Sequence, residues 1–276
     1  MFYYWMCFLK KSLPLQHKII KNSNIMQRFT KAIAAIMLMT AVFCAAGCTK
    51  PDEPNNGGND NEGNEGNSLN GHEYVDLGLP SGTLWATCNV GAYGVPEGYG
   101  NFFAWSNTAV MGDFNWSAHW YSNSNTSELT KYCSNSYYGF NGYVDTLSVL
   151  LPNDDAATAQ WGEGWRTPTK VEWEELFRGT THTWTKLNEV NGRLFTASNG
   201  NSIFLPAAGL YCEGTEWFCE GNIHYNPKVE GHYWSSSLNT GDPISAWVFA
   251  FDLDDYGMGN LDRYIGCSIR AVCTQR

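Results

Sequence analysis

From Gly71 onward, the sequence consists of short apolar runs that are separated by glycine, proline, asparagine and serine. Apolar runs of about four to eight residues between such turn residues are typical of β-strands, because a helix needs a longer periodic segment to bury one face. We therefore expect strands over residues 74–79, 83–90, 102–105, 202–205, 246–251 and 265–272. This spacing predicts a domain of short strands with little helix.

Two segments carry helical signals instead. The first covers residues 152–160, with Asn153 as its N-cap, and acidic residues near its start suit the helix dipole. The second begins at Thr169, and Glu172 three residues later completes a capping box, in which each side chain bonds the backbone N–H of the other residue. Its apolar face is expected to consist of Val171, Trp173, Leu176 and Phe177.

The remaining long segments, 111–141 and 211–231, are polar and rich in aromatic residues. Loops of this length in a compact domain are usually either functional or disordered. All of the twelve tryptophans except Trp5 lie after residue 47, which argues against disorder. We therefore expect these segments to be functional loops.

Residues 26–48 have the organisation of a secretory signal peptide. Arg28 and Lys31 precede an apolar run over 32–46, which is about 15 residues long and shorter than the roughly 20 residues of a membrane-spanning helix. The run ends in Ala-Ala-Gly before Cys48, which resembles the lipobox of bacterial lipoproteins, although Ala45 stands where leucine is common. We expect residues 1–47 to be removed and Cys48 to be lipidated, with 1–25 as an extension from a misassigned start codon.

Residues 48–70 are mostly asparagine, glycine, aspartate and glutamate. Such a segment buries too little apolar surface to offset the entropy of ordering, so it is expected to be a disordered acidic tether. Asp52 and Glu53 resemble the surface-export signals of Bacteroidetes lipoproteins. The sequence thus predicts a protein anchored by lipid to the outer membrane and facing the cell exterior.

The charge distribution excludes one class of partner. The formal net charge is −10, and removing the six lysines and arginines of residues 1–47, which contain no acidic residue, moves it to about −16. A surface this acidic repels nucleic-acid phosphates. We expect no nucleic-acid partner and contact with the membrane only through the lipid anchor.

Several sequence blocks together resemble the Fibrobacter succinogenes major paralogous domain. They occur in the order of that family across residues 71–276: EYVDLGLPSGTLWATCNVGA (73–92), YGNFFAW (99–105), WGEGWRTPTKVEWEELF (161–177), NGNSIFLPAAG (199–209), YWSSS (233–237) and GCSIRAVC (266–273). The resemblance implies a single domain of the C-type-lectin-like fold. That fold is α+β, with small antiparallel sheets, two helices and long loops that carry the binding surface.

The same resemblance links the chain to the formylglycine-generating, sulfatase-modifying enzymes, which use a pair of cysteines near the C-terminus. Six cysteines follow the tether, namely Cys88, Cys133, Cys212, Cys219, Cys267 and Cys273. They can form disulfides in an exported protein or remain as buried free thiols, and the sequence does not decide between the two. Cys267 and Cys273 are expected on one apolar strand with their side chains on the same face, which favours core thiols or a disulfide over catalysis.

No metal or cofactor site is expected. The lectin-like triplet Glu53-Pro54-Asn55 lies in the tether, where no scaffold fixes its oxygens. Asp252, Asp254 and Asp255 could in principle hold a hard cation, but a solvated acidic turn is the simpler interpretation. The histidines show no metal-binding spacing, and Ser235–Ser237 are interpreted as a structural turn.

Aromatic rings beside short polar side chains are the composition of adaptable recognition surfaces. The aromatic candidates include Tyr211 and Phe218, and the exposed part is expected in a glycine-rich hairpin over 254–263. The predicted ligand-binding residues are Trp217, Tyr225, Trp247, Asp254, Asp255, Tyr256, Asn260, Asp262, Arg263 and Tyr264.

The sequence therefore predicts a non-catalytic surface lipoprotein that binds an extracellular glycan or protein through its C-terminal loops. Two alternatives remain open at this point. One is an enzyme or former enzyme related to the sulfatase-modifying group. The other is a surface receptor or adhesin whose segment 238–265 is diversified by a retroelement, as in some lectin-fold proteins.

Overall fold

The computed structural model describes residues 67–123, 128–213 and 222–274. All of them belong to the second of the two units into which the chain divides, residues 62–276. Cys48, Trp217, Phe218 and Cys219 lie outside the described residues, so the predictions that concern them stay predictions. No helix within the described ranges has the length and hydropathy of a membrane span.

The largest sheet of the described part has five strands in the order β12-β11-β10-β13-β4. Its members are β12 (Tyr256–Asp262), β11 (Ser245–Phe251), β10 (Gly231–Leu238), β13 (Cys267–Ser268) and β4 (Phe102–Phe103). All neighbouring strands are antiparallel except β10 and β13, which are parallel.

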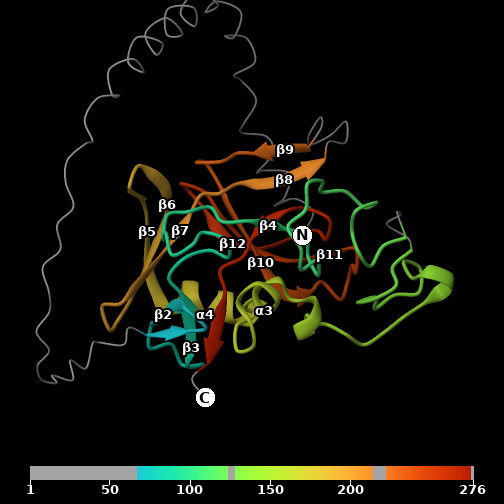
Figure 1. Ribbon diagram of the computed structural model, residues 1–276, viewed down its shortest axis with the longest axis horizontal. Coiled ribbons are helices and arrows are strands. Elements are labelled where there is room, and N and C mark those ends of the chain that lie inside the picture. Colours follow the sequence, from blue (N-terminus) through green and yellow to red (C-terminus); the bar gives the residue numbers. More distant parts are fainter. Residues whose placement is uncertain (1–66, 124–127, 214–221, 275–276) are drawn as a thin grey trace, which may run out of the picture. The chain divides into compact units, whose positions relative to one another are not determined.

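Three smaller antiparallel sheets surround it (Figure 1). The first has the order β1-β2-β3-β14, with β1 (Ser68–Leu69), β2 (His72–Asp76), β3 (Thr83–Ala86) and β14 (Val272–Thr274). The second consists of β5 (Thr180–Leu187), β6 (Val190–Ala197) and β7 (Ser202–Pro206). The third is the hairpin of β8 (Leu210–Glu213) and β9 (Asn222–Tyr225), drawn at the end of the domain opposite to β2 and β3.

Helical structure among the described residues is short. It comprises the 3-10 turns η2 (Phe140–Gly142) and η3 (Pro152–Asp154) and the helices α3 (Ala156–Trp161) and α4 (Lys170–Gly179). The prediction of small antiparallel sheets with few helices is confirmed. Strand β1 lies within the range 48–70 that was predicted to be a tether, so the folded part starts before residue 71.

Helix α4 joins the sheets through aromatic packing. Its residue Trp173 is fully buried, stacks on Phe249 of β11 with ring centroids 4.9 Å apart, and contacts Trp85 of β3 at the same distance. Leu176 is also buried, but Val171 is 71% exposed, so its predicted place in the apolar face is wrong. Replacing one buried aromatic ring of this kind by alanine typically costs about 3–5 kcal/mol, so this contact is a main source of stability.

The start of α4 is held by a buried carboxylate, that of Glu172. The predicted capping box is present: Thr169 Oγ1 accepts from Glu172 N, and Thr169 N donates 2.7 Å to Glu172 Oε2. Glu172 also accepts from Thr83 Oγ1 of β3 at 3.0 Å and from both terminal nitrogens of Arg166. The backbone of Arg166 pairs with Val272 of β14. We call this set of bonds the Glu172 network.

The fully buried Arg270 connects strands of two sheets. Arg270 donates from all three nitrogens, to the side chain of Asn89 and to the carbonyls of Ala86, Thr87 and Phe204. It thereby links the end of β3 to β7, and its charge is shared among four acceptors, which makes burial tolerable.

Two of the predicted elements are wrong in detail. Helix α3 is capped by Asp155, whose side chain accepts from Ala157 N, and not by Asn153. The predicted strand 265–272 is divided into β13 and β14, which belong to different sheets, so Cys267 and Cys273 do not share a strand. Arg270 lies between them, and its side-chain bonds hold the connecting segment.

We predict that Glu172→Gln lowers the free energy of unfolding at pH 7 by about 2–4 kcal/mol, because it removes one charge of a buried, hydrogen-bonded pair. The measurement is urea unfolding followed by tryptophan fluorescence. Glu174→Gln is the control: Glu174 lies on the same helix but bonds only partly exposed Lys170 and Arg178, so it should change stability by less than about 0.5 kcal/mol. Equal effects of the two variants would contradict the role of the network.

The same network predicts a pH dependence. Burial alone would raise the pKa of Glu172, but the hydrogen bonds and charge of Arg166, aided by Thr169, outweigh it and lower the pKa from 4.5 to about 2. A lowered folded-state pKa stabilises the fold above the unfolded value, and this contribution is lost as the pH falls from 4.5 through about 2. The stability of Glu172→Gln should therefore fall less steeply than that of the wild type over this window, and parallel curves would refute the assignment.

Candidate functional site

The predicted ligand-binding residues that the structure describes do not form one site. They fall into four places: the turn between β11 and β12, the far end of the same strand pair, the core, and the surface near the β8–β9 hairpin. The predicted glycine-rich hairpin over 254–263 is in fact the turn followed by β12, an edge strand of the large sheet. The four places differ in burial and in the strands that carry them.

The turn between β11 and β12 is stabilised by hydrogen bonds among its own acidic residues. The carboxylate of Asp252 accepts from the backbone N–H groups of Asp254 at 2.8 Å and Asp255 at 2.7 Å. Within the described ranges, no three histidine, cysteine, aspartate or glutamate side chains come together as metal ligands do. The side chains of Asp254 and Asp255 are exposed, as a solvated acidic turn requires.

Tyr256 begins β12 and packs inward from this turn. Its ring lies 4.0 Å from that of His182 on β5, and the guanidinium of Arg193 lies 4.9 Å from its centre. It is 38% exposed and so contributes partly to the surface. Its main contacts are structural, because they join β12 to the β5–β6–β7 sheet.

Trp247 and Asn260 are cross-strand partners at the other end of the pair. The ammonium of Lys170 lies 3.3 Å from the centre of the Trp247 ring, which is a close cation–π contact. Asp262 is partly buried near Asp242, and burial, followed by that neighbouring charge, raises its pKa to about 6. Trp247 is half-buried.

Arg263 is fully buried, so the prediction that it is an exposed binding residue is wrong. Its Nη1 donates to the carbonyls of Lys131, Tyr132 and Pro243, each at 3.3 Å. The guanidinium also lies 4.9 Å from the Trp105 ring. Burial lowers its pKa to about 9. An arginine that follows an edge strand gives no sequence signal for this, because none of its acceptors is a near neighbour in the sequence: Pro243 lies 20 residues away, and Lys131 and Tyr132 lie more than a hundred.

The fourth place is a cluster of rings around the β8–β9 hairpin, which we call the aromatic face. Tyr211 of β8 and His224 of β9 are cross-strand partners, and their rings are stacked with centroids 4.5 Å apart and planes 6° apart. Phe102 of β4 meets both rings edge-on, at 4.8 Å and 5.2 Å. Directly opposed aromatic side chains stabilise a strand pair, so the stack also fixes the register of the hairpin.

Further rings extend the aromatic face. Tyr264 contacts the ring of Trp116, with centroids 5.2 Å apart. Gly266, two residues after Tyr264, exchanges backbone hydrogen bonds with Tyr211. A side chain at Gly266 would collide with the ring of Phe114, so only glycine allows this approach. The members that are half-buried are Phe102, Trp116, Tyr211, His224 and Tyr264.

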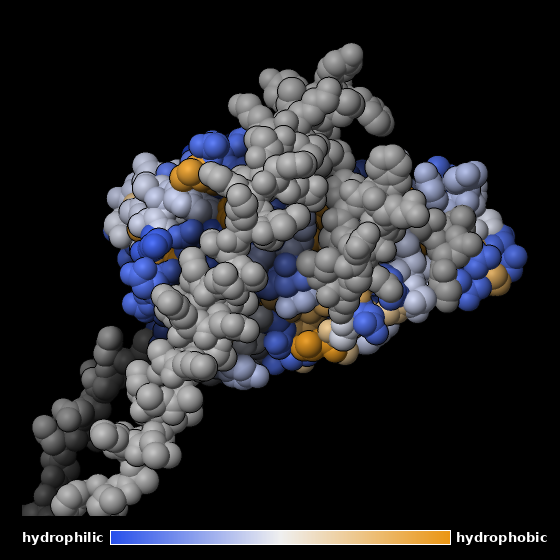
Figure 2. All heavy atoms as spheres, turned by 90° about the horizontal axis from the view of Figure 1, so that it is seen from above, coloured by the Kyte–Doolittle hydropathy of each residue, from blue (hydrophilic) through white to orange (hydrophobic). Residues whose placement is uncertain are grey.

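The aromatic face contains one of the predicted site residues, Tyr264, and the candidate ring Tyr211. Tyr225 is paired with Leu210 and therefore lies on the other face of the hairpin. Sequence reasoning missed Phe102, Trp116 and His224. The sequence places Phe102 in a strand, and nothing local indicates that this strand ends beside a hairpin more than a hundred residues later. In the view of Figure 2, the hydrophobic residues that are not grey form small separate patches among hydrophilic ones.

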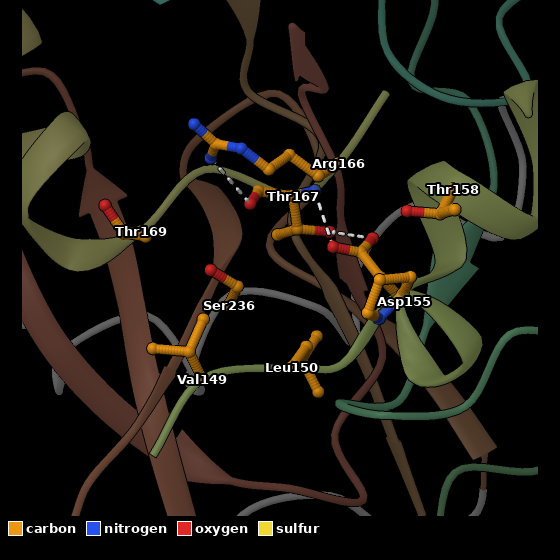
Figure 3. A pocket seen from close by; sticks show the side chains of 9 residues that line it. Val149, Leu150, Asp155, Thr158, Arg166, Thr167, Thr169 and Ser236 are labelled. Carbon is orange, nitrogen blue, oxygen red and sulfur yellow. Dashed lines mark hydrogen bonds between the residues drawn. The ribbon is translucent and has the colours of Figure 1, made fainter. Parts of the chain in front are cut away.

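A cavity of about 190 Å³ forms where β10 is irregular. Between Trp234 and Leu238 the register with β11 shifts, and Ser236 pairs instead with other segments: its N–H donates to Pro168 O and its carbonyl accepts from Leu150 N. The cavity lies between these segments and α3 (Figure 3). Its lining consists of Val149, Leu150, Pro152, Asp155, Thr158, Arg166, Thr167, Thr169 and Ser236.

Hydrogen bonds of two acidic residues, Asp154 and Asp155, fix the walls of this cavity. Asp155 accepts from the backbone and side chain of Thr167, at 2.8 Å and 2.7 Å (Figure 3). The preceding Asp154 bonds Lys131 at 2.6 Å and Tyr132 at 2.5 Å, and Tyr132 in turn accepts from Leu151 N. The interpretation from the sequence explains these two acidic residues by the helix dipole alone. Their contacts show that they also fix the segment before α3.

The described cysteines occur in two forms. Cys88, Cys133, Cys267 and Cys273 are free and buried, whereas Cys212 is disulfide-bonded. Burial raises the pKa of Cys267 well above its usual range and that of Cys273 to about 11, against a smaller opposing effect of Arg166. The two alternatives left open by the sequence, disulfide and free thiol, are thus both realised.

Comparisons of the chain with family models, with curated proteins and with solved structures returned no match.

We predict that iodoacetamide at pH 7 modifies the four free thiols at least about 100-fold more slowly in the native protein than in urea, because a buried thiol reacts only after opening. Peptide mapping by mass spectrometry distinguishes the four positions from the other cysteines of the chain. Rapid modification of Cys267 or Cys273 in the native protein would contradict their buried state. It would also favour the alternative of an enzyme related to the sulfatase-modifying group.

Proposed function

We propose that this chain is a surface lipoprotein whose domain holds an extracellular glycan or protein without transforming it. The observation that carries the proposal is the aromatic face, where the Tyr211–His224 stack and its neighbours fix half-buried rings at one end of the domain. Fixed rings lose little entropy on binding and offer an apolar surface beside polar groups. Such a surface suits the apolar side of a sugar ring or an aliphatic side chain.

The proposal places the domain in the Fibrobacter succinogenes major paralogous family, with a C-type-lectin-like fold. The support is the ordered set of sequence blocks over 71–276, together with small antiparallel sheets, few helices and a capped helix at the block Arg166–Trp173. The proposal also includes lipidation at Cys48 and display on the outer membrane, which are supported by the leader sequence alone.

Binding through the aromatic face makes a specific prediction. The purified full chain is first screened on glycan and protein arrays, and the best ligand is then titrated against variants. Tyr264→Ala and Tyr211→Ala should each raise the dissociation constant at least about tenfold, because a few aromatic contacts near the centre of an interface contribute most of its affinity.

Tyr137→Ala is the matched control, since Tyr137 is 76% exposed and contacts the ring of Tyr138 rather than the aromatic face. It should bind like the wild type. A ligand whose affinity is unchanged by both Tyr211→Ala and Tyr264→Ala would show that the aromatic face is not the binding surface.

A further inference from the structure

The cavity at the irregular part of β10 contains a buried hydroxyl group without a hydrogen-bond partner. Ser236 is 2% exposed, and its Oγ bonds no atom in the part of the chain that the structure describes. In Figure 3 it lies between Thr169, Asp155 and Leu150, which line the same cavity. A buried hydroxyl is normally satisfied, because an unpaired one has lost its hydration without compensation. Its place in a cavity indicates a partner that enters from outside.

The hydroxyls of the two adjacent serines both have hydrogen-bond partners. Ser235 Oγ donates to the carbonyl of Trp247 at 2.8 Å. Ser237 Oγ accepts from the backbone N–H of Lys170 at 3.1 Å. Ser236 stands between them and is turned into the cavity by the shift of register. Bulges of this kind commonly direct a side chain toward a functional site.

The other hydroxyls of the cavity offer acceptor oxygens and no free hydrogen. Each already donates its hydrogen to a neighbour: Thr158 to Trp165 O, Thr167 to Asp155 and Thr169 to Glu172. The remaining lone pairs of Thr158 and Thr169, which are both partly exposed, can accept. A fitting ligand therefore brings several hydrogen-bond donors and at least one acceptor for Ser236, which is a property of hydroxyl groups.

The charges around the cavity disfavour anionic ligands. Arg166 is the cation of the lining, and both of its terminal nitrogens already bond Glu172. The buried Asp155 presents a carboxylate to the same space. An anion would thus meet a negative group without gaining a free cation, and this favours a neutral ligand.

Size and shape narrow the ligand further. About 190 Å³ is far more than the roughly 15 Å³ that one water molecule requires by the same measure, but less than the roughly 300 Å³ of the smaller drug-sized sites. Val149, Leu150 and Pro152 supply an apolar wall opposite the polar groups. A single pyranose ring has matching faces, with C–H groups on one side and hydroxyls at the edge.

We infer that this cavity binds one neutral sugar ring through Ser236, Asp155 and the neighbouring threonine oxygens. The site shares no residue with the aromatic face, so the inference goes beyond the proposed function and does not depend on it. A site of this size holds an isolated monosaccharide weakly, with a dissociation constant on the order of 1 mM.

The test is ligand-observed NMR with the purified full chain and separate samples of glucose, galactose, mannose, N-acetylglucosamine and glucuronate. At least one neutral sugar should bind with millimolar affinity, and glucuronate should not. Ser236→Ala should weaken binding of that sugar at least about fivefold, because it removes the unpaired hydroxyl of the cavity. Without sugar, the melting temperature of Ser236→Ala should equal or exceed that of the wild type, since no hydrogen bond within the described part is lost.

Two further variants separate the outcomes. Ser148→Ala removes an exposed hydroxyl just outside the lining and should leave sugar binding unchanged. Val149→Trp narrows the cavity at a residue that is 41% exposed and should abolish binding even if Ser236→Ala proves unstable.

Three results would overturn the inference. They are binding of no neutral sugar, binding that survives both Ser236→Ala and Val149→Trp, and binding of butylammonium in place of sugars, which would make Asp155 the anchor of a cation site. Tyr211→Ala should leave monosaccharide binding intact, so failure of this inference is distinguishable from failure of the aromatic face.

Discussion

The Glu172 network is the interaction on which the arrangement of the domain depends. A carboxylate that is 9% exposed is tolerated only when its oxygens are fully bonded, and here the partners come from three parts of the chain. Arg166 precedes the helix, Thr169 caps it and Thr83 belongs to β3. Because Arg166 also pairs through its backbone with β14, one buried charge fixes α4 and the β1–β2–β3–β14 sheet in a single geometry.

Both candidate binding regions are built on this frame but use different parts of it. The cavity lies between the segment 166–169, which the network immobilises, and the irregular part of β10. The aromatic face is at the other end, where β8 is joined through Gly266 to the segment before β13. Aromatic packing of Trp173 against Phe249 connects the two ends through the large sheet. Rigid elements thus position both surfaces, which is what binding without chemical change requires.

The sequence predicts local features of this domain well and distant ones poorly. The capping box at Thr169 and the buried strand β11 could be predicted because their signals lie within a few residues. Strands β5 and β6 were missed, since their half-exposed residues form no continuous apolar run and their turn uses Asn188 and Glu189 at positive φ without a glycine. The burial of Arg263, the division of the last strand and the cavity all depend on contacts between remote segments, which a pattern in one segment does not contain.

Native-state hydrogen exchange of the wild-type chain tests most directly whether the Glu172 network makes α4 and the sheets one cooperative unit. If it does, the amide groups within α4 should exchange with the same free energy of opening as those of the central strand β10, because α4 then opens only in global unfolding. Exchange of the α4 amides through a local opening of much lower free energy would contradict this account.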